Sequence, residues 1–316
     1  MNPFSMLFGS GVWLRNALYD RHVFRVHSLD RPVVSIGNIS VGGTGKTPFV
    51  IALGGLLKER GIEFDVISRG YGRASKQITI VDPEGSPEEF GDEPLLIARK
   101  LNVPVIVGAD RRRAGVLAEK QFPKSELHLL DDGFQHRRLH RDFDIVLVSD
   151  EDVGDRLLPF GRLREPFSAL RRADAVVLAS TSAIPLPRTV WRVRRNIHFL
   201  LPMKRVVAFC GIARPEQFFS GLRKLGMEIA DTVAFPDHHR YTQGDIDRLL
   251  RAQAQTSARG FITTEKDAIN LGPLTKQLRT FESVGLEVQV ENAPQVLDAM
   301  LSTLRERRGF RLYPSA

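Results

Sequence analysis

Residues 33–48 read VVSIGNISVGGTGKTP, and this stretch decides the fold class. It opens with a short run rich in β-branched side chains, which predicts a buried strand. A glycine-rich turn follows, and Lys46 and Thr47 then lead into a helical stretch at residues 48–60. A strand, a glycine-rich loop and a helix in this order are the context of a phosphate-binding loop. The sequence therefore predicts an α/β fold of the P-loop NTPase type.

The residues of this loop suit a nucleoside triphosphate. Its glycines leave the backbone N–H groups free to curl around a phosphate, and the helix N-terminus adds its positive dipole. Lys46 would reach the β- and γ-phosphates, while the hydroxyl of Thr47 would bind Mg²⁺. Ser40 stands where the general pattern G-x4-G-K-[ST] has glycine. The residues expected to hold the nucleotide are Ser40, Gly42, Gly43, Thr44, Gly45, Lys46 and Thr47.

Length and composition limit the class of protein. A chain of 316 residues has room for two domains or one large α/β domain. Cys210 is the only cysteine, which excludes a disulfide framework and is typical of a reducing, cytoplasmic setting. The net charge of +8 favours an acidic partner, either a phosphorylated substrate or an anionic membrane. Nucleic acid ranks below these, because the sequence has no zinc-finger spacing or RNP aromatic pattern.

The N-terminal stretch at residues 3–14, PFSMLFGSGVWL, is apolar but short. A helix needs ~20 apolar residues to cross a bilayer, so this stretch is too short to span one. It also lacks the charged start and the cleavage site of a signal peptide. Two interpretations stay open. The stretch is either a helix packed on the protein's own core or an amphipathic helix at a membrane interface, with Trp13, Arg15 and Arg21 at the headgroups.

Strands and helices alternate along the first two-thirds of the chain. The predicted strands are residues 33–37, 64–68, 103–108, 127–131, 144–148 and 175–179, and residues 78–81 are interpreted as an added strand or a hairpin. The predicted helices among them are residues 48–60, 92–100 and 110–121. Apolar strands that alternate with helices imply a mostly parallel sheet covered on both faces.

A second, smaller α/β unit is predicted beyond a basic, Pro-containing stretch that we interpret as a hinge. Its strands are expected at residues 206–210, 228–235, 260–264 and 286–290, and its helices at residues 215–226, 245–256 and 294–308. The expected division is an N-terminal segment at 1–28, a P-loop domain at 29–182, a hinge at 183–204 and a smaller domain at 205–316. A cleft between two such units is a common place for a ligand.

Two adjacent carboxylates end the strand predicted at residues 127–131. The run LHLLDDGFQH places Asp131 and Asp132 where an apolar strand meets a glycine. This is the Walker B arrangement, which holds a carboxylate beside Mg²⁺, at the strand ends where open α/β sheets bind ligands. Asp-Asp-Gly is also good turn chemistry, so a solvated turn is the alternative.

Two loops of the first unit carry further candidates. Glycines flank Tyr71 in SRGYG (68–72), which permits close approach to a ligand. The run GDEP (91–94) places Asp92 and Glu93 at a helix start. There they are either N-terminal caps or a general base and a metal ligand.

Two more loops carry cations and histidines. An arginine in LLPFGRLREP (157–166) would stabilise the charge of a transferred phosphoryl group, unless this is a plain surface loop. In FPDHHRY (235–241), Asp237 beside His238 and His239 suggests an acid–base or orienting pair, with a polar turn as the alternative. The spacing of TEKD (264–267) fails the guanine-specifying pattern, because the aspartate directly follows the lysine, so a GTP switch protein is disfavoured.

Together these segments closely resemble the tetraacyldisaccharide 4'-kinase family, the lipid A kinases of the Gram-negative inner membrane. The motifs that carry the resemblance are SVGGTGKTP (40–48), SRGYG (68–72), GDEP (91–94), DDGFQH (131–136), LREP (163–166), DHH (237–239) and TEKD (264–267). They spread over most of the chain. One departure is Arg162, where the family's GPLREP loop has proline.

The resemblance implies a reaction. ATP would phosphorylate the 4'-hydroxyl of a tetraacylated glucosamine disaccharide 1-phosphate, with Mg²⁺ as cofactor. The partners implied are this lipid substrate and an anionic membrane surface; we infer no nucleic acid and no obligate protein partner. The protein would sit on the cytoplasmic face of the inner membrane, as a peripheral or monotopic protein that uses its N-terminal segment.

The resemblance also suggests roles for the site residues. Lys46 would hold the β- and γ-phosphates, and Arg164 and His136 would stabilise the transferred phosphoryl group. Asp92, supported by His238, would accept or orient the proton of the sugar hydroxyl. Tyr71 would contact the nucleotide or the substrate. The side chains expected to serve Mg²⁺ are Thr47, Glu93, Asp131 and Asp132.

Two functions of other classes remain open. A P-loop ATPase that drives partner binding predicts ATP turnover without any lipid. A soluble P-loop metabolite kinase or ligase predicts full activity after deletion of the N-terminal stretch.

Overall fold

The computed structural model describes residues 3–179, 189–198 and 205–309. Its strands are β1 (Val33–Asn38), β2 (Phe64–Ser68), β3 (Thr79–Ile80), β4 (Val105–Val107), β5 (Leu127–Asp131), β6 (Phe143–Val148), β7 (Ala175–Leu178), β8 (Thr189–His198), β9 (Val206–Cys210), β10 (Ile229–Ala234), β11 (Gly260–Thr264) and β12 (Phe281–Val290). Its helices are α1 (Pro3–Asp20), α2 (Lys46–Glu59), α3 (Pro87–Phe90), α4 (Asp92–Leu101), α5 (Arg111–Gln121), α6 (Pro215–Lys224), α7 (Gln243–Thr256), α8 (Glu265–Leu271) and α9 (Ala293–Arg308). Short 3₁₀ turns are η1 (Asp150–Asp152), η2 (Phe167–Arg172) and η3 (Gly272–Gln277).

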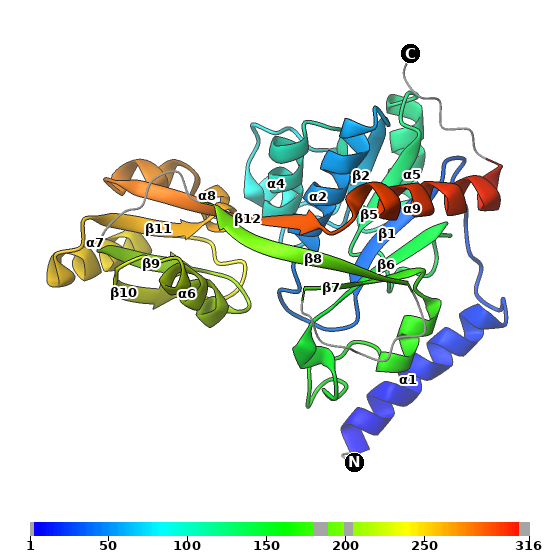
Figure 1. Ribbon diagram of the computed structural model, residues 1–316, viewed down its shortest axis with the longest axis horizontal. Helices are drawn as coiled ribbons and strands as arrows, with labels where there is room; N and C mark the ends of the chain where they lie inside the picture. The colour runs from blue at the N-terminus through cyan, green and yellow to red at the C-terminus, as the bar shows by residue number, and fades with distance from the viewer. Residues whose placement is uncertain (1–2, 180–188, 199–204, 310–316) are drawn as a thin grey trace.

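The strands join into one mixed sheet of twelve strands, in the order β10-β9-β11-β12-β8-β7-β6-β1-β5-β2-β4-β3. The neighbours pair in parallel, apart from β3 with β4 and β12 with β8. Figure 1 shows a larger group of strands around β1 and a smaller group around β9, joined by the long strands β8 and β12. The mostly parallel α/β fold predicted from the sequence is confirmed.

Helices cover both faces of the larger group. On one face, Val34 and Ile36 of β1 pack into a core with Phe49 and Leu53 of α2. On the other face, Val33 packs with residues of α5, and a separate cluster gathers around Phe134 and η2. Strand residues that point alternately to the two faces explain why β1 is apolar along its length.

The smaller group repeats this plan with its own cores. Phe209 and Phe261 pack on one face with residues of α7, and Val206 and Ala208 pack on the other with residues of α6. In Figure 1, α6 and α7 lie beside β9 and β10. The strands predicted at 206–210 and 260–264 therefore form as expected.

The stretch expected to be a hinge differs from the prediction. Residues 189–198 form β8, which pairs in parallel with β7 and antiparallel with β12. Trp191 and Val193 point into the main core, while exposed Arg194 lies between Val193 and Arg195. Basic side chains on the outward positions made this strand resemble a linker, because its apolar side chains occupy only alternate positions.

The closing helix α9 belongs with the larger group rather than with the unit that precedes it. Its buried residues Leu297, Met300, Leu301 and Leu304 pack in the same core as α2. Arg307 and Arg308 at its end pair with Asp174 and Asp142. The chain thus crosses to the smaller group after β8 and returns through β12, so the boundary expected at residue 205 does not separate two continuous segments.

The N-terminal helix α1 lies along the edge of the larger group (Figure 1). Its inner side is tied down, since Asn16 Nδ2 donates to Glu165 Oε2 at 2.8 Å and Arg15 lies 3.6 Å from the same carboxylate. Its other side exposes Leu7, Trp13 and Leu14. Among the described residues, no helix combines the length and the apolar character needed to cross a membrane.

Candidate active site

The loop between β1 and α2 has the backbone geometry of a phosphate cradle. Gly42 and Gly45 have φ angles of +97° and +84°, in the left-handed region that side chains disfavour. Gly45 is also the N-cap of α2, and glycine has no side chain to satisfy the first N–H groups of the helix. Those N–H groups can therefore bind an anion. Ser40 lies before the turn, in a β-bridge with Leu163, where glycine is not required.

Lys46 and Arg164 converge on the carboxylate of Asp132. Lys46 Nζ and Arg164 Nη2 lie 3.4 and 3.0 Å from the same Asp132 oxygen, Oδ1. Burial opposes ionisation of Asp132, but the charges of Lys46 and Arg164 outweigh it and hold the pKa of this carboxyl below its ordinary value. The two cations expected to contact the transferred phosphoryl group thus lie side by side.

Asp131 occupies a drier position at the end of β5. Its Oδ2 accepts a hydrogen bond from Ser68 Oγ at 2.8 Å, while its buried Oδ1 has no partner among the described residues. Burial, together with the charges of Glu93 and Asp132, raises the pKa of Asp131 to about 7. A buried carboxylate oxygen without a hydrogen-bond donor can coordinate a cation.

The donor set around Asp131 fits Mg²⁺. The predicted ligands are oxygens of Asp131, Asp132, Glu93 and Thr47, and Mg²⁺ prefers oxygen ligands. Within residues 3–179, 189–198 and 205–309, no three His, Cys, Asp or Glu side chains converge closely enough to hold a metal ion by themselves. Beside a nucleotide, Mg²⁺ takes part of its ligands from phosphates and water.

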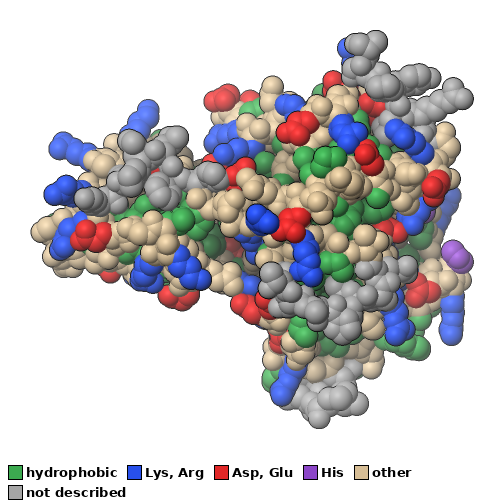
Figure 2. All heavy atoms as spheres, in the orientation of Figure 1, with side chains coloured by type: hydrophobic (Ala, Val, Ile, Leu, Met, Phe, Trp, Pro, Cys, Tyr) green, Lys and Arg blue, Asp and Glu red, His purple; other side chains and the backbone are tan. Residues whose placement is uncertain are grey.

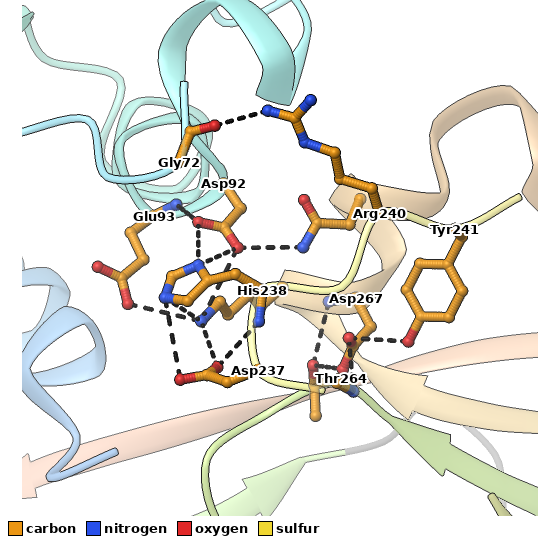
Figure 3. A network of polar contacts seen from close by, with 12 residues as sticks. Gly72, Asp92, Glu93, Asp237, His238, Arg240, Tyr241, Thr264 and Asp267 are labelled. Carbon is orange, nitrogen blue, oxygen red and sulfur yellow. Dashed lines mark hydrogen bonds and ion pairs between the residues drawn. The ribbon is translucent and has the colours of Figure 1, made fainter. Parts of the chain in front are cut away.

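Asp92 and His238 come together from the two groups of strands. Asp92 begins α4 in the larger group, and His238 lies in the turn between β10 and α7 (Figure 3). His238 Nδ1 lies 2.9 Å from Asp92 Oδ2, and the Asp92 carboxylate is almost fully buried. Burial opposes ionisation, but the hydrogen bond from His238 and the charge of Lys266 keep the pKa of Asp92 below its ordinary value. Asp92 is therefore an ionised carboxylate at neutral pH.

Lys266 completes this network, although its position in the sequence predicts no role for it. Its Nζ lies 3.8 Å from Asp92, 3.7 Å from Glu93 and 3.2 Å from His238 Nε2. Asn270 on α8 donates to Asp92 Oδ2 at 3.0 Å. Figure 3 shows Asp92, Glu93 and His238 of this network gathered where the start of α4 meets the loop after β10. TEKD was recognised as a motif, but only the fold brings its lysine to Asp92.

The neighbouring His239 has a different partner. Its Nε2 lies 3.0 Å from Asp245 Oδ2, and Asp245 also caps the start of α7 through Thr242. Its ring stacks on Phe235, with the ring centroids 4.8 Å apart. Of the two adjacent histidines, His238 is the one in contact with Asp92.

Tyr71 lies beside His238, and His136 lies in the loop after Asp132. The Tyr71 side chain is exposed, and its ring centroid lies 5.0 Å from that of His238. Burial, with the charges of Arg111 and Arg141, lowers the pKa of His136 to about 4. His136 is therefore neutral at neutral pH, so any support it gives to a phosphate comes from a hydrogen bond rather than from a charge.

Two arginines that the sequence analysis did not single out also approach the site. Arg195 of β8 donates from Nη2 to the carbonyl oxygen of Thr44 at 2.7 Å, and its guanidinium lies against Gly45. Arg111, buried at the start of α5, interacts electrostatically with Asp131 and Asp132. Neither residue lies in one of the sequence motifs. Each comes from an element, β8 or α5, that is remote in sequence from the phosphate loop.

Comparison with known proteins shows the family of the chain. The sequence profile of the family described as LpxK, tetraacyldisaccharide-1-P 4'-kinase, matches residues 1–305. The chain belongs to this family. A tetraacyldisaccharide 4'-kinase of Koribacter versatilis is 50% identical over 323 residues, which cover 98% of this chain and 100% of that protein. The tetraacyldisaccharide 4'-kinase of Syntrophus aciditrophicus is 40% identical, with 92% of this chain and 89% of that protein covered.

A solved structure of the same kinase family shares the fold. LpxK from Aquifex aeolicus, crystallised in complex with ATP, superposes with a TM-score of 0.79 at 34% sequence identity. The superposition covers 96% of this chain and 97% of the other. The resemblance to tetraacyldisaccharide 4'-kinases noted from motifs is thereby confirmed along the whole chain.

Proposed function

We propose that this chain is the ATP-dependent kinase that phosphorylates the 4'-hydroxyl of tetraacyldisaccharide 1-phosphate in lipid A biosynthesis. The observation that carries the proposal is the contact of an ionised, buried Asp92 with His238, in a chain whose glycine loop presents Lys46 at the start of α2. A phosphate cradle and a carboxylate base are the two parts that transfer of a phosphoryl group to a hydroxyl requires.

In the proposed mechanism, the backbone of residues 42–47 and Lys46 hold the β- and γ-phosphates of ATP. Asp92 accepts the proton of the sugar hydroxyl while the hydroxyl oxygen forms a bond to the γ-phosphorus of ATP. The bond between that phosphorus and the leaving ADP breaks in the same step. His238 orients the Asp92 carboxylate, and Arg164 faces the charge that develops on the transferred group. Mg²⁺, when bound, neutralises phosphate charge, and Thr47, Glu93, Asp131 and Asp132 are the side chains proposed to hold it.

The substrate side of the proposal rests on the exposed residues around the dyad. Tyr71 is exposed beside His238, which favours contact with the sugar headgroup over contact with a buried nucleotide. His136 would donate a neutral hydrogen bond to an anionic group of either substrate.

The membrane side of the proposal rests on α1. Leu7, Trp13 and Leu14 expose apolar surface on one side of this helix, while its other side is bonded to Glu165. Such a helix suits the interface of an anionic bilayer, which would hold the lipid substrate, on the cytoplasmic face of the inner membrane. On the face drawn in Figure 2, Lys and Arg side chains lie over both ends of the molecule. Attachment would be peripheral or monotopic.

The decisive test is transfer of label from γ-labelled ATP to tetraacyldisaccharide 1-phosphate in mixed micelles. We expect a labelled bisphosphorylated lipid and a dependence on both Mg²⁺ and micelles. ATP hydrolysis that is equally fast without lipid would instead favour a partner-regulated ATPase. Label that appears only in water-soluble acceptors would favour a metabolite kinase or ligase.

A further inference from the structure

Asn38, the last residue of β1, stands where the segments of the site meet. Its side chain is fully buried. Its Nδ2 donates to Thr44 Oγ1 at 2.8 Å, and its Oδ1 accepts from Lys46 Nζ at 3.3 Å and from Arg164 Nη2. Its backbone oxygen accepts from Gln135 Nε2 at 2.8 Å. One residue therefore touches the phosphate loop, the arginine loop and the loop after Asp132.

The neighbours fix which way the amide points. Lys46 and Arg164 are donors only, so the atom that faces them must be the carbonyl oxygen. The amide nitrogen is then left to donate to the hydroxyl of Thr44. Every polar atom of the buried side chain has a partner, which holds the two cations at a defined place relative to the phosphate loop.

The neutrality of this side chain matters as much as its geometry. An amide oxygen attracts both cations through its dipole but leaves their charges uncancelled. Asp132 already supplies one negative charge to the same pair, at 3.4 Å from Lys46 and 3.0 Å from Arg164. A second carboxylate at residue 38 would cancel the remaining positive charge, which a γ-phosphate needs.

We propose that Asn38 is a positioning residue, whose uncharged carboxamide aims Lys46 and Arg164 together at the γ-phosphoryl group. The inference rests on the proposed kinase function, in which these two cations contact that group. The preference for ATP over ADP depends on the same two aligned cations, with or without a lipid acceptor.

The test compares Asn38→Asp, which has nearly the same shape, with Asn38→Ala. Ser35→Ala serves as the matched control, because Ser35 is a buried polar residue of the same strand whose partners on the neighbouring strands are Leu130 and Asp144. We expect Asn38→Asp to lower kcat for phosphate transfer on the order of 10²-fold, and Asn38→Ala on the order of 10-fold. Ser35→Ala should stay within about threefold of the unchanged chain.

A second readout does not need the lipid. Calorimetric titration with MgATP and MgADP gives the ratio of the two dissociation constants for each variant. Asn38→Asp should raise the dissociation constant of MgATP at least about tenfold more than that of MgADP, because only ATP carries the γ-phosphate. A purely structural role would weaken both nucleotides equally and lower the melting temperature.

A double-mutant cycle shows whether Asn38 acts through Arg164. In an Arg164→Ala background, Asn38→Ala should cost less than about threefold further in kcat, whereas full additivity would overturn the inference. A folded Asn38→Asp with near-normal kcat and an unchanged ATP-to-ADP ratio would also overturn it. If Asn38→Asp fails to fold, Asn38→Ala and the cycle decide. Failure of the unchanged chain to label the lipid would contradict the proposed function, while the nucleotide ratios would still test Asn38.

Discussion

Lys46 is the side chain on which phosphoryl transfer should depend most directly. It follows the left-handed Gly45 at the start of α2, and its Nζ lies within 3.4 Å of Asp132 and of Asn38. We expect Lys46→Ala to lower kcat on the order of 10²-fold or more without unfolding the protein, because it removes one preorganised charge from the transferred group. Steady-state kinetics and a thermal melt measure both effects. Lys224→Ala, on an exposed position of α6, is the control. Near-normal turnover of a folded Lys46→Ala would contradict the assignment of the loop.

Asp92 should act mainly in the transition state. His238 and Lys266 keep its carboxylate ionised, although the residue is almost fully buried. We expect Asp92→Ala to lower kcat on the order of 10²- to 10⁴-fold, with a much smaller change in the KM for ATP. Collapse of ATP affinity with kcat preserved would instead make Asp92 a nucleotide ligand.

His238 should act through Asp92 and not independently. His238→Ala is expected to lower kcat less than Asp92→Ala, and the double variant should be little worse than Asp92→Ala alone. His239→Ala is the matched control, because His239 pairs with Asp245 at the start of α7. Its kcat should stay near normal, with a small loss in melting temperature. A larger loss of kcat in His239→Ala than in His238→Ala would reverse the assignment.

Helix α1 joins two tasks that truncation alone does not separate. Deletion of residues 1–18 should weaken membrane association and raise the KM for the lipid, but it also removes the bonds of Arg15 and Asn16 to buried Glu165. A lower melting temperature of the truncated protein is therefore expected as well. The two tasks lie on different sides of the helix, so surface substitutions divide them.

Replacing the exposed Leu7, Trp13 and Leu14 by serine should weaken vesicle binding while the melting temperature stays unchanged. Each of these side chains contributes ~1.5–3 kcal/mol when fully removed from water, and less at an interface. Co-sedimentation with anionic vesicles measures the effect, and Val116→Ser, an exposed position on α5, is the control. Normal vesicle binding by the triple variant would contradict the membrane role of α1.

The molecule as a whole should lose stability in alkaline solution through one buried histidine. His128 of β5 lies 2.7 Å from Asp65 of β2 and 3.4 Å from Glu119 of α5. Burial opposes protonation, but the hydrogen bonds and charges of Asp65 and Glu119 raise the pKa of His128 to about 9. The ordinary pKa of a histidine is about 6.5, so the folded chain binds this proton more tightly than the unfolded chain does.

The sign of the pH dependence follows from this raised pKa. Stabilisation by His128 is complete below pH ~6.5 and is lost as the pH rises through about 9. We expect the free energy of unfolding to fall by a few kcal/mol between these limits, on an order-of-magnitude basis. Denaturant unfolding from pH 6 to 10 measures it against the neutral pair His128→Gln with Asp65→Asn, which should show a shallower slope. Equal slopes would contradict the role of His128.

The two groups of strands also meet away from Asp92. Glu151 of η1 pairs with Arg214 beyond β9 at 2.9 Å and with Arg162 at 2.7 Å. Arg162 stands where the resemblance led us to expect proline, and it donates to the Glu151 carboxylate, which also contacts the smaller group. Arg240 adds a bond to the carbonyl oxygen of Gly72 at 2.6 Å. These contacts, like that between Asp92 and His238, join the two groups of strands.

Local sequence patterns were enough to predict most strands, most helices and the phosphate loop of this protein. Buried parallel strands need continuous apolar runs, and a phosphate loop needs glycines at particular positions. Both can therefore be recognised in a short stretch of sequence. The carboxylates at 92, 93, 131 and 132 were found for the same reason, because each follows a strand or starts a helix. Family motifs then supplied their proposed roles.

Other features depend on contacts between residues far apart in the chain. Residues 189–198 were interpreted as a hinge, yet they form β8, because pairing with β7 and β12 outweighs their basic composition. The adjacent His238 and His239 are equivalent in sequence, and the turn after β10 sends only His238 to Asp92. Arg195 and Lys266 likewise reach the site from segments remote in sequence, and Asn38 meets Arg164 in the same way. The sequence determines the chemistry of each side chain. Which side chains come together in one site depends on tertiary contacts, which short stretches of sequence do not predict.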